Sequence, residues 1–195
     1  LNVGDQAKIT SVPMTGYHFK QYEINGTAPA MDVTKPDQTI TVYGFVVLTA
    51  KAEANTYSVR FEANGGEGSM KDQSMTYDVE AALSSNTFVR EHYYFNGWNT
   101  KKDGTGTAYK NKQKVKNLSA EQGDVVTLYA QWKKKPTYKV TYNLNGGKMD
   151  SKTGTVSNKY EEGQIITLPK PSRKGYKFRY WVGTDGDEFD AGEKI

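Results

Sequence analysis

Two histidines, His18 and His92, are the side chains of this chain best suited to acid–base chemistry at neutral pH. Imidazole serves as a general base because its ordinary pKa lies near neutrality, but catalysis also needs a nucleophile or a second acid nearby. The internal repeat described below places the two histidines at different repeat positions, so neither belongs to a repeated polar constellation. We therefore predict no catalytic residue and expect that the protein is not an enzyme.

An acidic run from Asp185 to Asp190 is the best candidate for a metal site, because clustered carboxylates are typical of calcium loops. The matching stretch of the preceding repeat, Lys102–Thr105, keeps the glycine and has lost most of the acids. A hairpin turn explains this pattern better than a metal site does. The absence of cysteine excludes disulfides, thiol catalysis and cysteine-based zinc sites. We predict no metal and no cofactor.

Aromatic residues, with 14 tyrosines, 7 phenylalanines and 3 tryptophans, could form a carbohydrate platform. Tyrosine and tryptophan rings stack on sugars, but the rings of the repeated motif recur at fixed offsets, as the residues of a shared core do. We therefore assign the motif rings to the core and expect Tyr94 and Tyr109 to be exposed. The sequence assigns no ligand-binding residue.

Basic residues give the chain a formal net charge of +4 and gather in Lys101–Lys116 and Lys133–Lys135. Acids are interspersed elsewhere, so we interpret these stretches as solvated faces and a linker. We predict no nucleic-acid partner and keep an anionic cell-wall polymer as an alternative. No stretch approaches the roughly 18 apolar residues of a membrane span, so we expect no membrane insertion within this segment.

An internal repeat organises the chain. Residues 57–66 read Tyr-Ser-Val-Arg-Phe-Glu-Ala-Asn-Gly-Gly, and residues 138–147 follow the same pattern at an offset of 81. Trp98 matches Trp181 at an offset of 83, and Tyr22 matches Trp181 at an offset of 159. We predict three units: residues 1–54, which lack a first strand; residues 55–136, which are complete; and residues 137–195, which stop before a last strand.

The elements of one unit follow from its residue pattern. Apolar residues alternate from Tyr57 to Ala63 and from Val126 to Trp132, which predicts two half-buried strands. Asn64 and the two glycines after it predict a tight turn with positive φ. Residues 112–122 contain enough helix formers for one short helix or 3₁₀ turn. Residues 133–136, three lysines and a proline, predict a short connector.

Two repeat positions give sharper expectations. Gly16, His92 and Gly175 precede the aromatic motif, so we predict a tight turn there with positive φ, which histidine tolerates better than most residues. Trp98 and Trp181 should be buried in their own units. A phenylalanine lies three residues before each of them, on the opposite face of a regular strand, so either a bulge intervenes or the rings pack on different sides.

The Tyr-x-Val-x-Phe/Tyr-x-x-Asn-Gly-Gly pattern, the Tyr-x-Phe-x-x-Trp motif and the closing Leu-Tyr-Ala-Gln-Trp at 128–132 resemble the Listeria-Bacteroides repeat, the family of the internalin B repeat. This resemblance covers about 55–195. Residues 1–54, with Gly16, Tyr17 and the segment 37–43, resemble the mucin-binding-protein repeat. The resemblance implies predominantly β units of the α+β class with a β-grasp-like fold and at most one short helix each. It carries over no catalytic or metal residue.

These observations predict a non-catalytic repeat region of a secreted, Gram-positive surface protein, anchored to the cell wall through a region outside this segment. Such a region acts as a stalk or spacer and as an adhesion or protein-interaction module. Candidate partners are a host-surface protein or glycan, a cell-wall polymer and neighbouring repeats. Two alternatives stay open: a dedicated glycan- or mucin-binding module, and an accessory region of a larger secreted enzyme.

Overall fold

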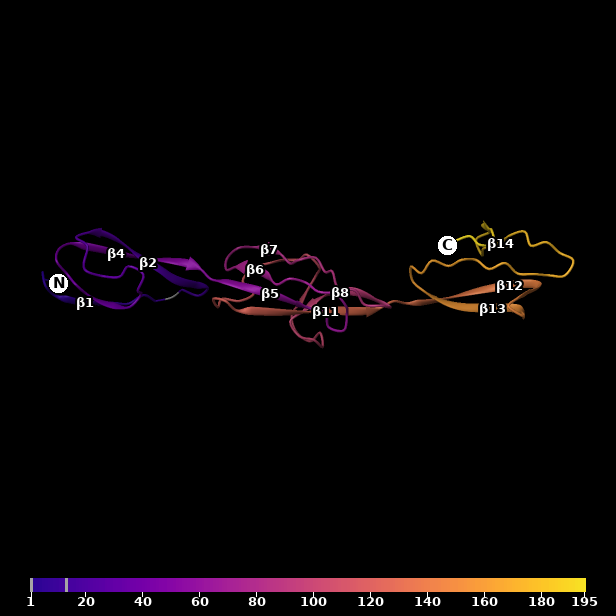
Figure 1. Ribbon diagram of the computed structural model, residues 1–195, viewed down its shortest axis with the longest axis horizontal. Coiled ribbons are helices and arrows are strands. Elements are labelled where there is room, and N and C mark those ends of the chain that lie inside the picture. Colours follow the sequence, from indigo (N-terminus) through magenta and orange to yellow (C-terminus); the bar gives the residue numbers. More distant parts are fainter. Residues whose placement is uncertain (1, 13) are drawn as a thin grey trace. The chain divides into compact units, whose positions relative to one another are not determined.

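The computed structural model describes residues 2–12 and 14–195, and within these residues it contains strands and turns but no helix. The strands run in chain order from β1 to β15 (Figure 1). The predominantly β character of the fold is therefore as predicted. The helical part of the expected α+β, β-grasp-like class is not found in the described residues.

The chain divides into two compact units. The first comprises the described residues up to Glu91 together with Phe95–Trp132, and the second comprises His92–Tyr94 together with Lys133–Ile195. Most strands lie entirely within one of the two units.

The amino-terminal part of the first unit is made of two antiparallel strand pairs. β1 (Gln6–Ile9) pairs with β3 (Gln38–Thr41), and β2 (Tyr17–Gly26) pairs with β4 (Val46–Ala54). The register of β2 shifts between Phe19 and Gln21. This bulge brings the rings of Phe19 and Tyr22 to one side of β2, with centroids 4.8 Å apart. The prediction that a bulge brings the two rings of the motif to the same side of the strand is therefore correct for this repeat.

The middle repeat, in the same unit, is built around a five-stranded sheet in the order β6-β5-β11-β8-β9. Its five strands are β5 (Thr56–Glu62), β6 (Gln73–Thr76), β8 (Tyr93–Asn99), β9 (Ala108–Tyr109) and β11 (Val125–Lys134). β5 and β11, the two strands predicted from apolar alternation, lie parallel and side by side (Figure 1). The short strands β7 (Ala81–Ala82) and β10 (Lys114–Val115) form a separate pair.

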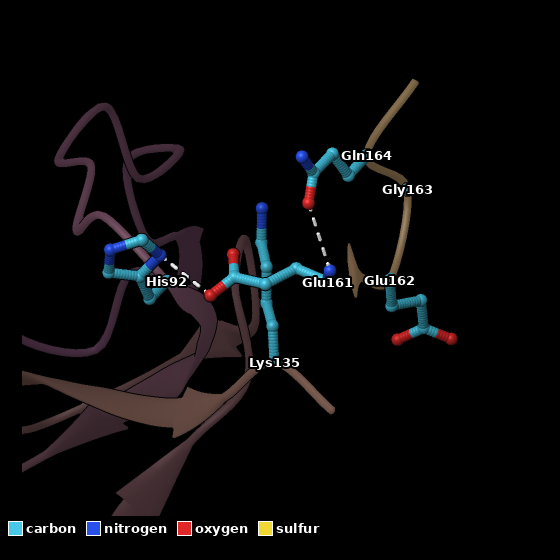
Figure 2. A pocket seen from close by; sticks show the side chains of 6 residues that line it. All are labelled: His92, Lys135, Glu161, Glu162, Gly163 and Gln164. Atoms are coloured by element: carbon cyan, nitrogen blue, oxygen red, sulfur yellow. Dashed lines mark hydrogen bonds and ion pairs between the residues drawn. The ribbon is translucent and has the colours of Figure 1, made fainter. Parts of the chain in front are cut away.

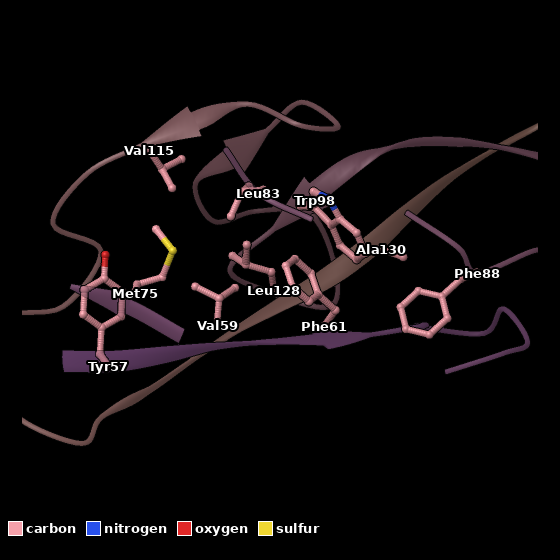
Figure 3. Close-up of a cluster of buried hydrophobic side chains, with 10 residues drawn as sticks. All are labelled: Tyr57, Val59, Phe61, Met75, Leu83, Phe88, Trp98, Val115, Leu128 and Ala130. Atoms are coloured by element: carbon pink, nitrogen blue, oxygen red, sulfur yellow. The ribbon is translucent and has the colours of Figure 1, made fainter. Parts of the chain in front are cut away.

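One face of this sheet carries the core of the middle repeat. Tyr57, Val59 and Phe61 are buried on β5, and Leu128 and Ala130 are buried on β11, which is the alternation that the sequence predicts. Figure 3 shows these side chains converging with others from the loops and from β6, β8 and β10. The loop residues Leu83 and Phe88 complete this core, with Leu83 near Val115 and Phe88 at one end of the cluster (Figure 3).

Trp98 lies at the centre of this core and is fully buried, as predicted. Its ring centroid is 4.8 Å from that of Phe61 and 4.9 Å from that of Phe95. Phe95 and Trp98 share a side because Gly97, with φ of 108°, interrupts the regular pleat of β8. Only glycine adopts this conformation without strain, so the backbone at Gly97 decides how the aromatic motif packs.

The second unit contains a long hairpin and a shorter one. β12 (Thr137–Met149) pairs with β13 (Lys152–Glu161), and β14 (Trp181–Val182) pairs with β15 (Glu188–Phe189). Its core consists of five buried apolar residues: Tyr142, Leu144, Met149, Val156 and Leu168. Trp181 packs against this core but is only half-buried, so the prediction that it is buried like Trp98 is wrong.

Two segments differ from the predicted elements. Residues 112–122, expected to hold a short helix or 3₁₀ turn, form β10 and turns instead. Lys112 and Asn117 have φ of 58° and 56°, which a right-handed helix does not accommodate. The predicted connector at 133–136 is shorter than expected, because β11 continues to Lys134 and β12 begins at Thr137.

The predicted turns before the aromatic motif and after β5 are present, whereas the turn expected at Asn145 is replaced by an irregularity within β12. Gly16, His92 and Gly175 have φ of 77°, 67° and 81°, so the left-handed turn before the aromatic motif recurs in all three repeats. Asn64 and Asn145 also have positive φ, of 48° and 42°. Asn64 begins a tight turn after β5, whereas Asn145 lies in an irregularity within β12, where the register with β13 shifts.

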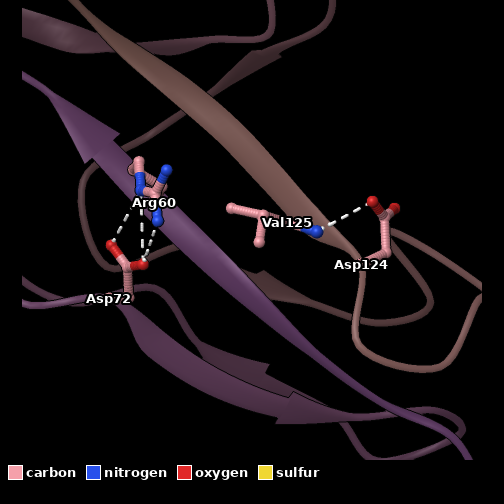
Figure 4. A network of polar contacts seen from close by, with 4 residues as sticks. All are labelled: Arg60, Asp72, Asp124 and Val125. Atoms are coloured by element: carbon pink, nitrogen blue, oxygen red, sulfur yellow. Dashed lines mark hydrogen bonds and ion pairs between the residues drawn. The ribbon is translucent and has the colours of Figure 1, made fainter.

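Two polar contacts of the middle repeat are exposed to solvent (Figure 4). The guanidinium of Arg60 on β5 donates to Asp72, with Nη2 2.9 Å from Oδ2, and the carboxylate of Asp124 accepts from the amide of Val125 at 2.8 Å. Exposed ion pairs contribute about 0–1 kcal/mol. The apolar core therefore provides most of the stability of the middle repeat.

Replacing Trp98 by alanine should lower the free energy of unfolding of the middle repeat by about 3–5 kcal/mol, because it leaves a cavity at the centre of a small core. Urea unfolding followed by circular dichroism measures the change. Tyr43→Ala, which removes an exposed ring, is the control and should cost less than about 0.5 kcal/mol. A loss below about 1 kcal/mol for Trp98→Ala would contradict the structure.

Gly16 and Gly175 share a repeat position and a positive φ, but their surroundings differ. A β-carbon at Gly16 would overlap the ring of Tyr77, whereas one at Gly175 would meet nothing within 4 Å. Gly175→Ala should therefore cost only the left-handed strain, about 1–2 kcal/mol, and Gly16→Ala about 1–3 kcal/mol more. Hydrogen exchange of the two units measures both losses, and equal losses would show that Tyr77 does not pack on Gly16.

Candidate functional site

The two histidines lie in different settings. His18, on β2, has Nδ1 2.8 Å from Oδ1 of Asn55, a buried amide that also donates to the carbonyl of Ala120 at 2.6 Å. His92 lies at the left-handed turn before β8, and its Nδ1 is 2.6 Å from Oε1 of Glu161. Acyl transfer requires a histidine hydrogen-bonded to a nucleophile such as a hydroxyl group. Neither of these two contacts joins the imidazole to a hydroxyl group.

A small pocket of about 300 Å³ surrounds the His92–Glu161 pair in the second unit (Figure 2). Its lining also includes Lys135, Glu162, Gly163 and Gln164. The polar groups largely satisfy one another: the amide of Glu161 donates to Gln164, and the hydroxyl of Tyr94 donates to Glu162 at 2.7 Å. These contacts join residues 92–94 to the start of the turn after β13. The polar groups of the pocket therefore hold these two segments together, and we call such an arrangement a polar clasp.

A similar polar clasp lies within the first unit, around Asp78. Its carboxylate accepts hydrogen bonds from Asn117 and from the hydroxyl of Tyr17, each at 3.0 Å, and Nζ of Lys116 lies 3.0 Å away. The hydrogen bond from Asn117, followed by those from Lys116 and Tyr17, lowers the pKa of Asp78 below its ordinary value. Asp78 and Glu161 occupy the same repeat position, so an acid anchors the turn in both places.

The acidic run at 185–190 forms the β14–β15 hairpin, as predicted from the shared glycine. Gly186 has φ of 93° in the connecting turn, and Oδ1 of Asp185 accepts from the amide of Asp187 at 3.3 Å. Within residues 2–12 and 14–195, no group of three or more His, Cys, Asp or Glu side chains could hold a metal ion. In this part of the chain there is also no helix long and apolar enough to cross a membrane.

The two tyrosines expected at the surface differ. Tyr94 is exposed, as predicted, with its ring beside Nζ of Lys135. Tyr109 is partly buried against the middle core, so its predicted exposure is wrong. The reason is that β9 pairs with β8 and brings Tyr109 opposite Trp98.

A groove of about 580 Å³ lies in the third repeat, and we call it the β12 groove. It lies between β12 and the segment 176–184. Tyr176 and Tyr180 on its rim are exposed, and the guanidinium of Arg173 stacks over Tyr176 at 4.2 Å. Tyr176 belongs to the repeated aromatic motif, so the prediction that the motif rings lie in the core is wrong for this residue. Residues that line it from the β12 side are Thr141, Asn143, Leu144, Asn145 and Gly147. The sequence analysis assigned no ligand-binding residue and so missed this groove.

Comparison with known families accounts for the whole chain. The model of the Listeria-Bacteroides repeat domain matches residues 57–131 and again residues 138–195, and the model of the divergent InlB B-repeat domain matches residues 1–56. This chain belongs to the Listeria-Bacteroides repeat family. The resemblance predicted for residues 55–195 is confirmed. The more distant resemblance of residues 1–54 to the mucin-binding-protein repeat is not, since the internalin-type model matches there instead.

Two relatives of this Listeria-Bacteroides repeat chain come from Evansella cellulosilytica. One, provisionally named a Gly-rich membrane protein, is 31% identical over 194 residues, covering 92% of this chain and 20% of the relative. The other, provisionally named a membrane protein, is 31% identical over 178 residues, covering 85% of this chain and 22% of the relative. The chain thus spans about a fifth of the length of these relatives. No solved structure matches it.

Acidification should weaken the clasp at Asp78. Because its pKa is lowered in the folded state, its contribution is present above the ordinary value of 3.8 and is lost as the pH falls through the lower folded value. Asp78→Asn removes this titration, so the difference in melting temperature between the native protein and the variant should shrink from about pH 6 to about pH 2.5.

Asparagine suits the positive φ of 64° at Asp78, so the variant should keep the turn. Asp150→Asn, at another turn with positive φ, removes the same charge and corrects for the change in net charge. A difference that stays constant over the whole pH range would contradict a role for the ionised Asp78 carboxylate.

Proposed function

We propose that this chain is a non-catalytic region of a bacterial cell-surface protein that acts as a stalk or spacer and as an adhesion or protein-interaction module. It would be held at the cell wall by other parts of a longer protein. One observation carries the proposal: most recurrent aromatic residues of the middle repeat pack into its own core, and in the amino-terminal repeat Phe19 packs on Tyr22. These residues of the two repeats are therefore used for folding, and the chemistry of the surface is left free to vary.

The repeat family and the relatives support this proposal. Tandem units with separate cores lengthen a chain without requiring contacts beyond the neighbouring unit. Several weakly binding units in one chain also gain affinity through multivalency. The names of the relatives refer to membrane proteins, which agrees with a location at the cell surface.

The spacer role is tested by placing the chain between a wall anchor and a terminal epitope on a Gram-positive host. The epitope should bind a bulky antibody much better than one attached directly to the anchor. A variant with Trp98→Ala, whose middle repeat is destabilised, should lose this advantage when surface proteases are present. Equal antibody binding with and without the repeats would refute the spacer role.

The adhesion role is tested separately with beads that carry the purified chain. They should adhere to mucin or host-cell surfaces more strongly than beads that carry an unrelated β-protein of equal net charge. Because the charge is matched, a difference reports recognition and not general electrostatic attraction. Equal adhesion of the two bead types would refute the adhesion role and would not affect the spacer role.

A dedicated glycan-binding module is the second candidate, and the exposed rings of Tyr176 and Tyr180 at the β12 groove favour it. Rings of this kind stack on sugars. Replacing both by alanine should abolish binding to a mucin glycan array while leaving the melting temperature unchanged. An unchanged array signal would exclude these two rings as the glycan site.

A further inference from the structure

The β12–β13 hairpin of the third repeat has two faces of different character. One face carries Tyr142, Leu144 and Val156, which are buried in the core of the second unit. Successive side chains of a strand point to opposite faces, so the side chains that alternate with these three lie on the outer face, where they are exposed. We call this outer face the lysine face, and the members that matter below are Lys139, Thr141, Lys148, Ser157 and Lys159.

Two lysines lie directly opposite each other on the lysine face. Lys139 of β12 is the ladder partner of Lys159 of β13. The next pair on the same face is Thr141 with Ser157, whose hydroxyl oxygens are 3.1 Å apart. Opposite residues of an antiparallel ladder have β-carbons about 4.5–5.5 Å apart, and like charges there repel each other. Both ammonium groups can therefore reach one anion placed between them.

Exposed cations on the other ladders of the chain are matched by acids. On β2–β4, Nζ of Lys51 lies 3.0 Å from Oε2 of Glu23, and on β5–β6 the guanidinium of Arg60 lies 2.9 Å from the carboxylate of Asp72. Among the ion pairs of the described residues, none includes either lysine of the β12–β13 pair. This ladder therefore keeps two adjacent positive charges that an external anion could neutralise.

The lysine pair distinguishes the third repeat from the middle repeat. At the repeat offset of 81, Lys139 corresponds to Ser58, whose ladder partner is Ser74. The outer face is open to solvent in the middle repeat as well, since Arg60 is exposed there although β11 lies beside β5. Exposure of this face is thus a property of the repeat, whereas the paired lysines are specific to the third one.

The neighbours of the lysine pair do not neutralise it. On one side lies the pair of Thr137 with Glu161, and Oε1 of this acid is 2.6 Å from Nδ1 of His92, so the carboxylate is bonded elsewhere. On the other side lie the hydroxyl groups of Thr141 and Ser157. An anion between the lysines would therefore meet two charges and two neutral hydrogen-bond donors.

This set of donors suits a phosphate group better than a carboxylate. A planar carboxylate is matched by the fork of arginine, and neither β12 nor β13 contains an arginine. Lysine binds phosphate as a compact point charge, and hydroxyl groups can donate to the remaining oxygens of a tetrahedral group. The chemistry of the pair therefore indicates a phosphate ester.

A further cation makes the lysine face long. After the register shift in β12 the ladder resumes with Lys148 opposite Thr153, which shares a face with Lys159 because the two are six residues apart on β13. At about 3.4 Å per residue this separation is about 20 Å. Between the two ends, Thr155 and Ser157 offer only neutral hydroxyl groups. A chain whose phosphates are separated by neutral, hydroxyl-bearing units matches this order.

We propose that the lysine face binds a polyol phosphate, a polymer of phosphodiesters joined by hydroxyl-bearing units. One phosphodiester lies between Lys139 and Lys159 and accepts hydrogen bonds from Thr141 and Ser157, and a later one lies at Lys148. The choice of a cell-wall polymer rests on the proposed location at the bacterial surface. The binding geometry does not depend on whether the repeats act as a spacer.

Calorimetric titration of the purified chain tests the site. The probes are a synthetic glycerol phosphate oligomer long enough to span about 20 Å and the glycerol phosphate monomer. The oligomer should bind the native chain more tightly than the monomer. Replacing Lys139 and Lys159 together by glutamine should weaken oligomer binding by at least about tenfold, because two charge-assisted hydrogen bonds are lost.

A matched control separates this site from general attraction. Lys170→Gln combined with Lys174→Gln removes the same charge at exposed positions outside β12 and β13, and should change oligomer binding by less than about twofold. Lys148→Gln should weaken binding of the oligomer and leave that of the monomer unchanged. The unliganded variant with both Lys139 and Lys159 replaced should melt at the native temperature or above it, since a repulsion is removed.

Absence of oligomer binding overturns the proposal, and so does equal weakening by the two double variants. Equal affinity for oligomer and monomer would show a site for a single anion and not for a polymer. If a sulfated glycan of equal charge binds more tightly through the same lysines, the partner is a host glycan and the proposal is wrong. None of these results bears on the spacer role, which antibody access to the terminal epitope tests by itself.

Discussion

The parallel pairing of β5 with β11 is the interaction on which the middle repeat depends. Paired residues of these strands lie 67 positions apart in the chain, since Leu128 lies opposite Phe61, and Trp98 is fully buried in the core on this sheet. β11 also pairs with β8, so one strand aligns the aromatic motif and supplies Leu128 and Ala130 to the core. In the third repeat, where the described residues provide no such strand, the same motif packs against a smaller core and Trp181 stays half-buried.

Much of this arrangement could be predicted from the sequence, because strict alternation and glycine turns are local signals. The strands β5 and β11, the core face of Tyr57, Val59 and Phe61, and the left-handed turn at His92 all follow from residues close together in the chain. Repetition strengthened these predictions, since the same pattern occurs at matching positions. Burial of Trp98 followed from its place in that pattern.

The errors arose where tertiary contacts decide. Tyr109 is covered because β9 returns to pair beside Trp98, which no local pattern indicates. The helix expected at 112–122 does not form, because Lys112 and Asn117 have positive φ. Only Asn117 could have indicated this from the sequence, since asparagine adopts positive φ more readily than most residues. Trp181 shows that a repeat position fixes an environment only when the surrounding strands are also repeated. The β12 groove was missed for the same reason.

The parallel direction of β5 and β11 has a mechanical consequence. The chain enters this pair at Thr56, the start of β5, and leaves it at Lys134, the end of β11. Parallel strands place these two points at opposite ends of the ladder, so tension along the backbone slides one strand past the other. The hydrogen bonds between them then bear the load together, in shear, whereas an antiparallel hairpin pulled at its open end would unzip one bond at a time. Resistance to drag is thereby set by strand direction, without any disulfide.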